Sequence, residues 1–392
     1  MWTAMWCQYV SISNMKKVLA IMVLMMFALA LPMQASSKSG DGKDDEGGMN
    51  LQEIIFEHLG DAYGWEVPFS HEHRIPLPVI VNDNRGGWHV FSSSRVTGGE
   101  SYDAGDGIVY RIASEGGNSG KVVQVAADGK EFRPVDLSIT KDVAALIVAA
   151  LIVLSVMLSL VRYYKRNGMK APRKGMGAVE ALIGFIYDGV LKNTLGEKAP
   201  KFAGFLLTAF FFIFTMNLLG LAVIFPGGAN LTGNIAVTLV LAVCTFVVTN
   251  IKGNKHYWKD IFWPDVPLAL KFPLPIMPVI ELFGIFTKPA ALCVRLFANM
   301  MGGHMIVIVL TLLIFIFAPF GAGVTTAATA VSVFFSLFML LLDVLVSFIQ
   351  AFVFTMLSTL FISLAVAEPE HHDKKEVEAC LLYTSPSPRD CS

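Results

Sequence analysis

The sequence predicts an all-α polytopic membrane protein: five membrane helices, the last two forming a long tilted hairpin, plus a small exported N-terminal module, rich in β-strands. Two observations predict this fold class. The chain is 54% hydrophobic and only 16% charged, whereas soluble proteins carry about 25% charged residues. From residue 143 onward, apolar stretches long enough to cross a bilayer follow one another. The net charge of -1 argues against a nucleic-acid partner.

The first 35 residues have the pattern of a secretory signal peptide. Lys16 and Lys17 precede an apolar run from Val18 to Met33, and small residues after it offer a cleavage site. Met15 is a possible true start, because a complete signal follows it. An uncleaved membrane anchor is the alternative, which the shortness of the run disfavours. Residues 36–49 (SSKSGDGKDDEGGM) are polar and indicate a disordered linker.

Residues 50–140 form a polar module outside the membrane. Gly, Asn and Asp clusters separate short alternating runs, which is typical of strands and turns; the runs are Leu77–Val81, Trp88–Phe91, Ile108–Ile112 and Lys121–Val125. His58, His71 and His73 lack paired acids or cysteines at ligand spacing, so we expect no metal site. The segment Gly116–Lys121 (GGNSGK) lacks two key positions of a phosphate loop and is interpreted as a turn. We expect no cofactor.

The membrane domain is expected at residues 141–367. Its spans lie at about 143–161, 202–225, 235–251, 276–318 and 324–366. The last two each hold about 40 residues, roughly twice what a perpendicular crossing needs, so they must tilt, kink or lie partly in the membrane plane. Gly321-Ala322-Gly323 makes a tight turn between them and predicts a hairpin. Between the first two spans, Gly175–Leu195 is expected to be a helix along the surface.

Basic loops predict the orientation of the spans. Basic residues cluster at 162–174 and 252–259, and cytoplasmic loops are enriched in Lys and Arg. The loops at 226–233 and 319–323 contain neither residue and are expected outside. The polar module is then exported, and the C-terminus is cytoplasmic, as in a multi-pass protein of the bacterial inner (plasma) membrane. Residues 368–379 form a cytoplasmic tail, and 380–392 (CLLYTSPSPRDCS) are interpreted as a non-native scar.

Arg295 is the most informative residue, because it is a permanent charge inside an apolar span. A guanidinium in hydrocarbon costs about 3 to more than 10 kcal/mol, and it does not deprotonate. The neighbouring small residues Ala291, Ala298, Gly302 and Gly303 let another helix come close. This combination indicates a pathway for ions or protons. An arginine that reaches the interface is the alternative, disfavoured by the length of the span on both sides.

Further polar residues are placed around Arg295 at helical spacing. Glu281, Lys288 and Asn299 fall within about 40° of its helix face, and His304 falls about 180° away. Because this helix runs from inside to outside, Glu281 lies toward the cytoplasm and His304 toward the exterior. Polar groups are therefore expected on both sides of the arginine, both in membrane depth and in angle around the helix axis.

The last span contributes Asp343, Ser347 and Gln350, spaced four and three apart and hence on one helix face. A buried Asp needs a partner or a proton, and His304 is the natural candidate. Such a pair would pass protons near neutral pH; a structural ion pair that locks the hairpin is the alternative. The additional polar groups favour transport. Possible supporting residues are Lys288, Asn217, Asn234 and Ser347.

The same residues carry a family resemblance. Lys288–His304 (KPAALCVRLFANMMGGH) and Ile349–Ala367 (IQAFVFTMLSTLFISLAVA) closely resemble the two long helices of subunit a of F-type ATP synthases. Ala181–Tyr187 (ALIGFIY) and Phe214–Gly220 (FTMNLLG) fit the same family. The resemblance covers about residues 140–370.

The resemblance implies a proton-translocating, non-catalytic subunit that couples proton flow to ATP synthesis through two offset half-channels. Arg295 would be the essential arginine facing a carboxyl of the rotating c-subunit ring. The proton pathway would comprise Glu281, Asn299, His304, Asp343 and Gln350. The implied partners are the c ring, the b subunits of the peripheral stalk, other ATP synthase subunits and the lipid bilayer. No small-molecule substrate is implied other than protons or Na⁺.

One departure from the family pattern concerns His304 and Asp343. Many relatives have an acid at the first position and a His at the second, so the two are exchanged here. An exchanged pair keeps one acid and one imidazole, which supports their being neighbours. An independent ion channel or secondary cation/proton antiporter is the alternative function. Such carriers usually show internal repeats, and the Arg295 segment has no second copy.

Overall fold

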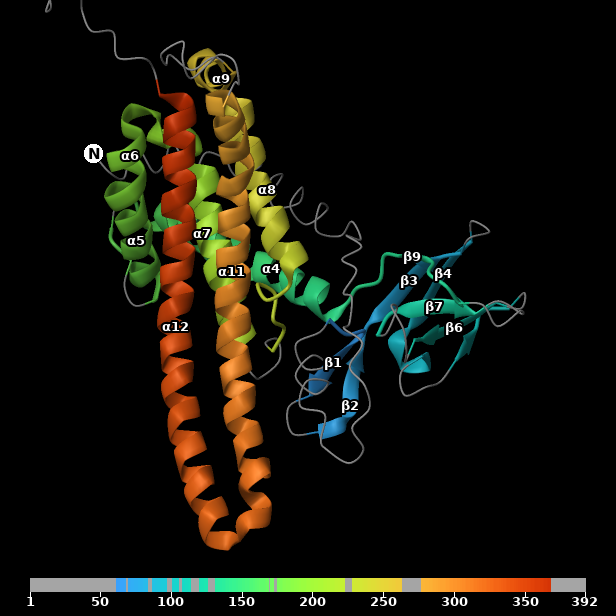
Figure 1. Cartoon of the computed structure of the whole chain (residues 1–392). Coiled ribbons are helices and arrows are strands. Elements are labelled where there is room, and N and C mark those ends of the chain that lie inside the picture. The colour runs from blue at the N-terminus through green and yellow to red at the C-terminus, as the bar shows by residue number, and fades with distance from the viewer. Residues whose placement is uncertain are drawn as a thin grey trace, which may run out of the picture.

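The computed structural model describes residues 61–367 apart from 68–69, 84–86, 97–100, 106–107, 114–119, 126–130, 169, 173–174, 223–227 and 263–275. It shows a bundle of long helices with a small β-module at one side (Figure 1). The predicted signal peptide, linker, cytoplasmic tail and scar lie outside the described residues, as do His58 and most of the GGNSGK turn.

The predicted fold class is confirmed: five helical stretches of the described chain are long and apolar enough to cross a membrane. The helices of this part are α4 (Lys141–Asn167), α5 (Gly175–Ile186), the π-helix η2 (Tyr187–Lys192), α6 (Asn193–Leu195), the 3-10 helix η3 (Gly196–Lys198), α7 (Ala199–Leu221), α8 (Ile235–Lys252), α9 (Lys255–Phe262), α11 (Ile276–Phe317), the 3-10 helix η4 (Ala318–Phe320) and α12 (Ala322–Val366).

Polar caps and glycines set the helix ends. The Thr140 hydroxyl accepts a hydrogen bond from Val143 N at the start of α4, and the Asn234 side chain accepts one from Ala236 N at the start of α8. Gly168, with φ 64°, follows α4. Gly321, with φ 107°, stands between η4 and α12, a conformation that side-chain-bearing residues rarely adopt. The tight turn predicted between the two long helices is therefore built on a glycine.

Helices α11 and α12 form an antiparallel hairpin that extends well beyond the other helices (Figure 1). They contain 42 and 45 residues, which corresponds to lengths of about 63 and 68 Å. This is roughly twice the thickness of a bilayer core. At the end away from the turn, α12 packs against α7 and α11 against α8.

The predicted surface helix is built of pieces. An α-helical segment, one π-helical turn and a short helix follow one another up to Gly196, whose φ is 53°. This stretch packs against α12, where Ser363 Oγ donates a hydrogen bond to the Thr194 carbonyl at 2.9 Å. Lys198 Nζ donates to the Val366 carbonyl at 3.0 Å. These two hydrogen bonds attach the C-terminal end of α12 to the segment that precedes α7.

The N-terminal module contains strands, as predicted. They are β1 (Gly64–Val67), β2 (Ser70–Pro76), β3 (Pro78–Asn82), β4 (Trp88–Ser92), β5 (Tyr102–Asp103), β6 (Val109–Ile112), β7 (Val122–Val125), β8 (Glu131–Phe132) and β9 (Val135–Asp136). The described strands form antiparallel sheets of order β1-β2, β4-β3-β9 and β5-β6-β7-β8. Val79, Val81 and Tyr110 are among the fully buried side chains of the module's own core.

Candidate functional site

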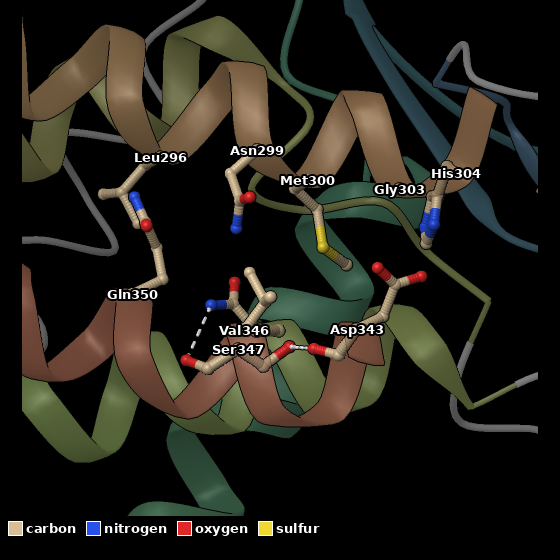
Figure 2. A pocket seen from close by; sticks show the side chains of 10 residues that line it. Leu296, Asn299, Met300, Gly303, His304, Asp343, Val346, Ser347 and Gln350 are labelled. Carbon is tan, nitrogen blue, oxygen red and sulfur yellow. Dashed lines mark hydrogen bonds between the residues drawn. The ribbon is translucent and has the colours of Figure 1, made fainter. Parts of the chain in front are cut away.

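A polar cavity lies where α11, α12 and α7 meet. The residues that line it are Asn217, Leu296, Asn299, Met300, Gly303, His304, Asp343, Val346, Ser347 and Gln350. Figure 2 shows side chains from α11 and α12 facing one another across it. Six residues singled out in the sequence meet here: Asn217, Asn299, His304, Asp343, Ser347 and Gln350.

His304 and Asp343 stand at the same end of this cavity (Figure 2). Asp343 comes close to the backbone of α11 because position 303 has no side chain: a Cβ on Gly303 would lie 2.7 Å from Asp343 Oδ1. The second oxygen of Asp343 is buried without a hydrogen-bond partner among the described residues. Such an orphaned acceptor is costly unless water or a proton satisfies it. The exchanged pair therefore shares one cavity.

Hydrogen bonds continue from Asp343 toward α7. Ser347 Oγ donates to the Asp343 carbonyl at 2.7 Å, and Asn217 Nδ2 donates to the Ser347 carbonyl at 3.5 Å (Figure 2). Asn217 Oδ1 in turn accepts a hydrogen bond from Thr232 Oγ1 at 2.7 Å. Asn217 and Thr232 are both buried. Buried amide and hydroxyl groups satisfied in this way fix the orientation of the cavity wall.

A second cavity, with both polar and apolar side chains in its lining, lies nearer the other end of α11. It is lined by Thr245, Phe246, Thr249, Asn250, Tyr257, Ile285, Lys288, Pro289, Leu292 and Phe361. The Lys288 ammonium stands 5.8 Å from the Phe361 ring centroid, within cation–π range. Tyr257 Oη donates a hydrogen bond to Asn250 Oδ1 at 3.4 Å. Burial, followed by the negative charge of Glu281, raises the pKa of Tyr257, so Glu281 acts on this region.

Arg295 lies on α11 between the two cavities. Leu292, one turn before it, lines the second cavity, and Leu296, just after it, lines the first. The arginine lines neither of them; it is exposed on the side of the subunit, next to the exposed residues Val294 and Ala298. The charge therefore faces outward, at a level of α11 between the two cavities.

Two of the four possible supporting residues, Asn234 and Lys288, lie apart from the first cavity. Asn234 caps α8, and its Nδ2 donates a hydrogen bond to Asp142 Oδ2 at 2.8 Å. Lys288 lines the second cavity. Sequence reasoning missed Asp142, Thr232 and the hydroxyl and amide groups of α8. For α8 a signal existed, because Thr245 and Thr249 are four residues apart in an apolar helix, and side chains so spaced share a face.

The module shows no metal chemistry in its described part. Among the residues that the structure describes, no group of three or more His, Cys, Asp and Glu side chains is placed to hold a metal ion.

Comparison with known proteins decides the family. The sequence profile of the ATP synthase A chain family matches residues 143–363. The chain belongs to this family. The ATP synthase A chain family comprises F-type ATP synthase subunits a, the proton-channel subunits of the membrane sector, so the resemblance drawn from the two motifs is confirmed. Membership also implies a multi-pass membrane protein with other ATP synthase subunits as partners.

Individual relatives agree with the ATP synthase A chain match. ATP synthase subunit a 2 of Chlorobaculum tepidum is 42% identical over 251 residues, 64% of this chain and 69% of that protein. ATP synthase subunit a of Myxococcus xanthus is 42% identical and aligns with 61% of this chain and 76% of its own length. ATP synthase subunit a 2 of Prosthecochloris aestuarii is 40% identical, over 72% of this chain and 86% of its own.

The N-terminal module has a profile match of its own. A domain of unknown function (DUF8433) matches residues 54–140. The ATP synthase A chain match begins only at residue 143, inside α4. The boundary between the two matched regions thus coincides with the start of the first membrane helix.

Proposed function

We propose that this chain carries ions through two offset half-channels past an essential arginine, Arg295, which acts against a rotating ring of c subunits. The observation that carries the proposal is the position of Arg295 on α11, between two separate cavities that both have polar side chains in their lining. A fixed cation at that point favours the ionised form of a passing carboxylate and hinders direct leakage of protons from one cavity to the other. The coupled ion is H⁺ or Na⁺.

The cavity lined by His304 and Asp343 is the proposed outer half-channel. It holds an imidazole and a carboxyl, and amide groups of Asn217, Asn299 and Gln350 complete its lining. Side chains that donate and accept protons are what a proton path through apolar helices requires. In synthesis, this cavity delivers the proton to the ring carboxylate.

The cavity lined by Lys288, Tyr257 and the polar face of α8 is the proposed inner half-channel. Glu281 belongs to the same region, through its charge on Tyr257. The predicted orientation of the basic loops places this end of α11 on the cytoplasmic side. A proton released from the ring after passing Arg295 leaves by this route.

The exposure of Arg295 on the side of the subunit supports a ring of helices as the partner. Arg295, Ala291 and Ala298 are exposed on one side of α11, and alanines let a neighbouring helix approach closely.

We further propose b subunits of a peripheral stalk as partners, a bacterial inner membrane location, an outer N-terminal module and a cytoplasmic C-terminus. The chain itself is non-catalytic in this proposal.

Replacement of Arg295 tests the proposal. Arg295→Ala should abolish ATP-driven proton pumping in inverted vesicles while the complex stays assembled, and Arg295→Lys should rescue poorly because an ammonium is smaller and can deprotonate. Arg166→Ala, an exposed arginine near the end of α4, is the control and should pump normally. Normal pumping by Arg295→Ala would refute the assignment.

A further inference from the structure

Among the described residues, the N-terminal module contacts the start of the membrane helices through residues 61–65. Lys141 N donates a hydrogen bond to the Ala62 carbonyl at 2.9 Å, and Asp142 N donates one to Asp61 Oδ1 at 3.1 Å. Trp65 is buried in the same apolar cluster as the membrane helices. The segment therefore joins the module to the first turn of α4.

The same segment is held firmly in the module. Tyr63 belongs to the module's core, and its hydroxyl donates a hydrogen bond to an Asp136 carboxylate oxygen. Val122 N donates to the Tyr63 oxygen at 3.3 Å. Asp61 is consequently presented to α4 by an ordered part of the β-module rather than by a free loop.

The first turn of α4 is polar, and the charge of its Lys141 acts on His304, which lines the outer cavity. Asp142 is buried, with 8% of its surface exposed, and one of its oxygens accepts the hydrogen bond from Asn234. The charge of Asp61 acts on Asp142. Lys141 lies close enough to His304 for its charge to act on that ring. The junction thus links the module with the proposed outer half-channel.

The groups that face Asp61 are Asp142 and Lys141 from α4 and Tyr63 from the module, with His304 of α11 beyond Lys141. Burial of the carboxyl at this junction raises the pKa of Asp61 above its usual value, against the opposing effect of its hydrogen bond with Thr140. The residue as a whole keeps an exposed surface. A residue that reaches the surface and whose carboxyl holds a proton more readily than usual is suited to proton uptake.

We propose that Asp61 is a proton-uptake residue, which the N-terminal module adds to the outer mouth of the half-channel. Asp61 takes a proton from the outer solution and shares it with Asp142, and the pair releases one proton toward the cavity of His304 and Asp343. One proton enters for each that leaves, so no other reactant is needed. The proposal rests on the function proposed above, and it assigns a role to a module that the family match does not cover.

A purely structural role for Asp61 makes a different prediction from a proton-handling role. If Asp61 only accepts the hydrogen bond of Asp142 N, then Asp61→Asn, which keeps an acceptor oxygen, should behave like the wild type. Asp61→Ser, with a hydroxyl acceptor, serves as a second variant without a carboxyl. Asp61→Glu restores the acid. Asp103→Asn is the matched control, because Asp103 also accepts a backbone hydrogen bond, from Gly105 N at 2.9 Å, but on an exposed part of the module.

The experiment measures ATP synthesis by the whole complex in proteoliposomes, with the pH on the outer face varied at constant total driving force. We expect Asp61→Asn and Asp61→Ser to lose rate several-fold at alkaline outer pH, where protons are scarce, and to approach the wild type at acidic outer pH. Asp61→Glu and Asp103→Asn should keep the wild-type profile. An unchanged profile in both acid-free variants, or an equal loss at every pH, overturns the proposal. In the first case the translocation function itself still stands, because synthesis is intact.

Discussion

Asp343 and His304 are two titratable side chains that share one buried polar cavity without a hydrogen bond between them among the described residues. A gap of this kind lets a water molecule or a proton mediate between the two groups. The unsatisfied oxygen of Asp343 gives the cavity an acceptor directed at that space. At the scale of residues, this arrangement supports the proposed role of the cavity in proton exchange rather than a permanent ion pair between the two side chains.

Coupling between these two residues is measurable. His304→Ala and Asp343→Ala should each strongly impair proton pumping, since each removes one of the two titratable groups that the proposed proton path requires. The exchange His304→Glu with Asp343→His should restore much of the rate, because it keeps one acid and one imidazole in the cavity. A double-mutant cycle on pumping rates gives the coupling directly. Additive losses with no recovery in the exchanged variant would mean that the residues act separately.

Gly303 gives a finer test of the same cavity. A methyl group at this position would meet Asp343 Oδ1 at 2.7 Å, which displaces the flexible carboxyl without breaking the helix. Gly303→Ala should therefore reduce pumping markedly while assembly remains normal. Gly184→Ala is the control, since no atom lies within 4 Å of the added methyl on α5. Wild-type pumping by Gly303→Ala would show that the position of this carboxyl does not limit transport.

At the scale of elements, α8 carries hydroxyl groups on the face that lines the inner cavity and apolar groups on the opposite side. Thr245 and Thr249 are buried there, whereas Val243 and Val247 are exposed. The two threonine hydroxyls donate to carbonyls of the preceding turn, at 3.4 and 2.8 Å. These bonds satisfy the hydroxyl donors within the helix and leave oxygen lone pairs for water.

Cysteine labelling distinguishes the two faces of α8. In a variant whose native cysteines have been replaced, Thr249→Cys and Asn299→Cys should react with small water-soluble thiol reagents in the membrane. Val247→Cys should react far less, because its side faces lipid and thiolates form only where water is present. Equal reactivity at the three positions would mean that no aqueous path follows the polar face.

The elements were predictable from the sequence to different degrees. Helical spacing was enough to place Asp343, Ser347 and Gln350 on one face, and all three line the outer cavity. Which α8 side chains line the inner cavity depends on which face of that helix packs against α11. Spacing within one helix does not determine this contact. The link from Asp61 to Asp142 joins positions 81 residues apart, and no local pattern marks such a contact.

At the scale of the whole molecule, the module and the membrane helices are joined by side chains from both. Trp65 lies in the buried cluster of the helical bundle, while Tyr63, two residues earlier, lies in the core of the module. Side chains two residues apart in an extended strand point to the same side, so this opposite placement reflects the bend at Tyr63, just before β1 begins at Gly64. The joint is small and depends on few contacts.

Loss of the Trp65 ring should loosen this joint. Burial of a tryptophan is worth about 3–5 kcal/mol against alanine, so Trp65→Ala should increase hydrogen exchange at the amides of Lys141 and Asp142, whose acceptors lie in residues 61 and 62. Trp88→Ala is the matched control, because Trp88 is 55% exposed on the module and should leave the exchange rates unchanged. Unaltered exchange in Trp65→Ala would show that the hydrogen bonds alone hold the module.

The surface of the long hairpin determines how the subunit would contact the proposed ring of c subunits. Much of its surface consists of exposed apolar side chains, among them Leu337, Leu341 and Phe334. In a bilayer such a surface gains nothing by leaving lipid for another apolar surface, because acyl chains are equally apolar. In the proposed complex, adhesion to a passing helix is therefore weak along most of the contact, and the exposed charge of Arg295 supplies the strong attraction. If the hairpin faces a ring as proposed, the ring can turn past this surface step by step without having to break a broad interface each time.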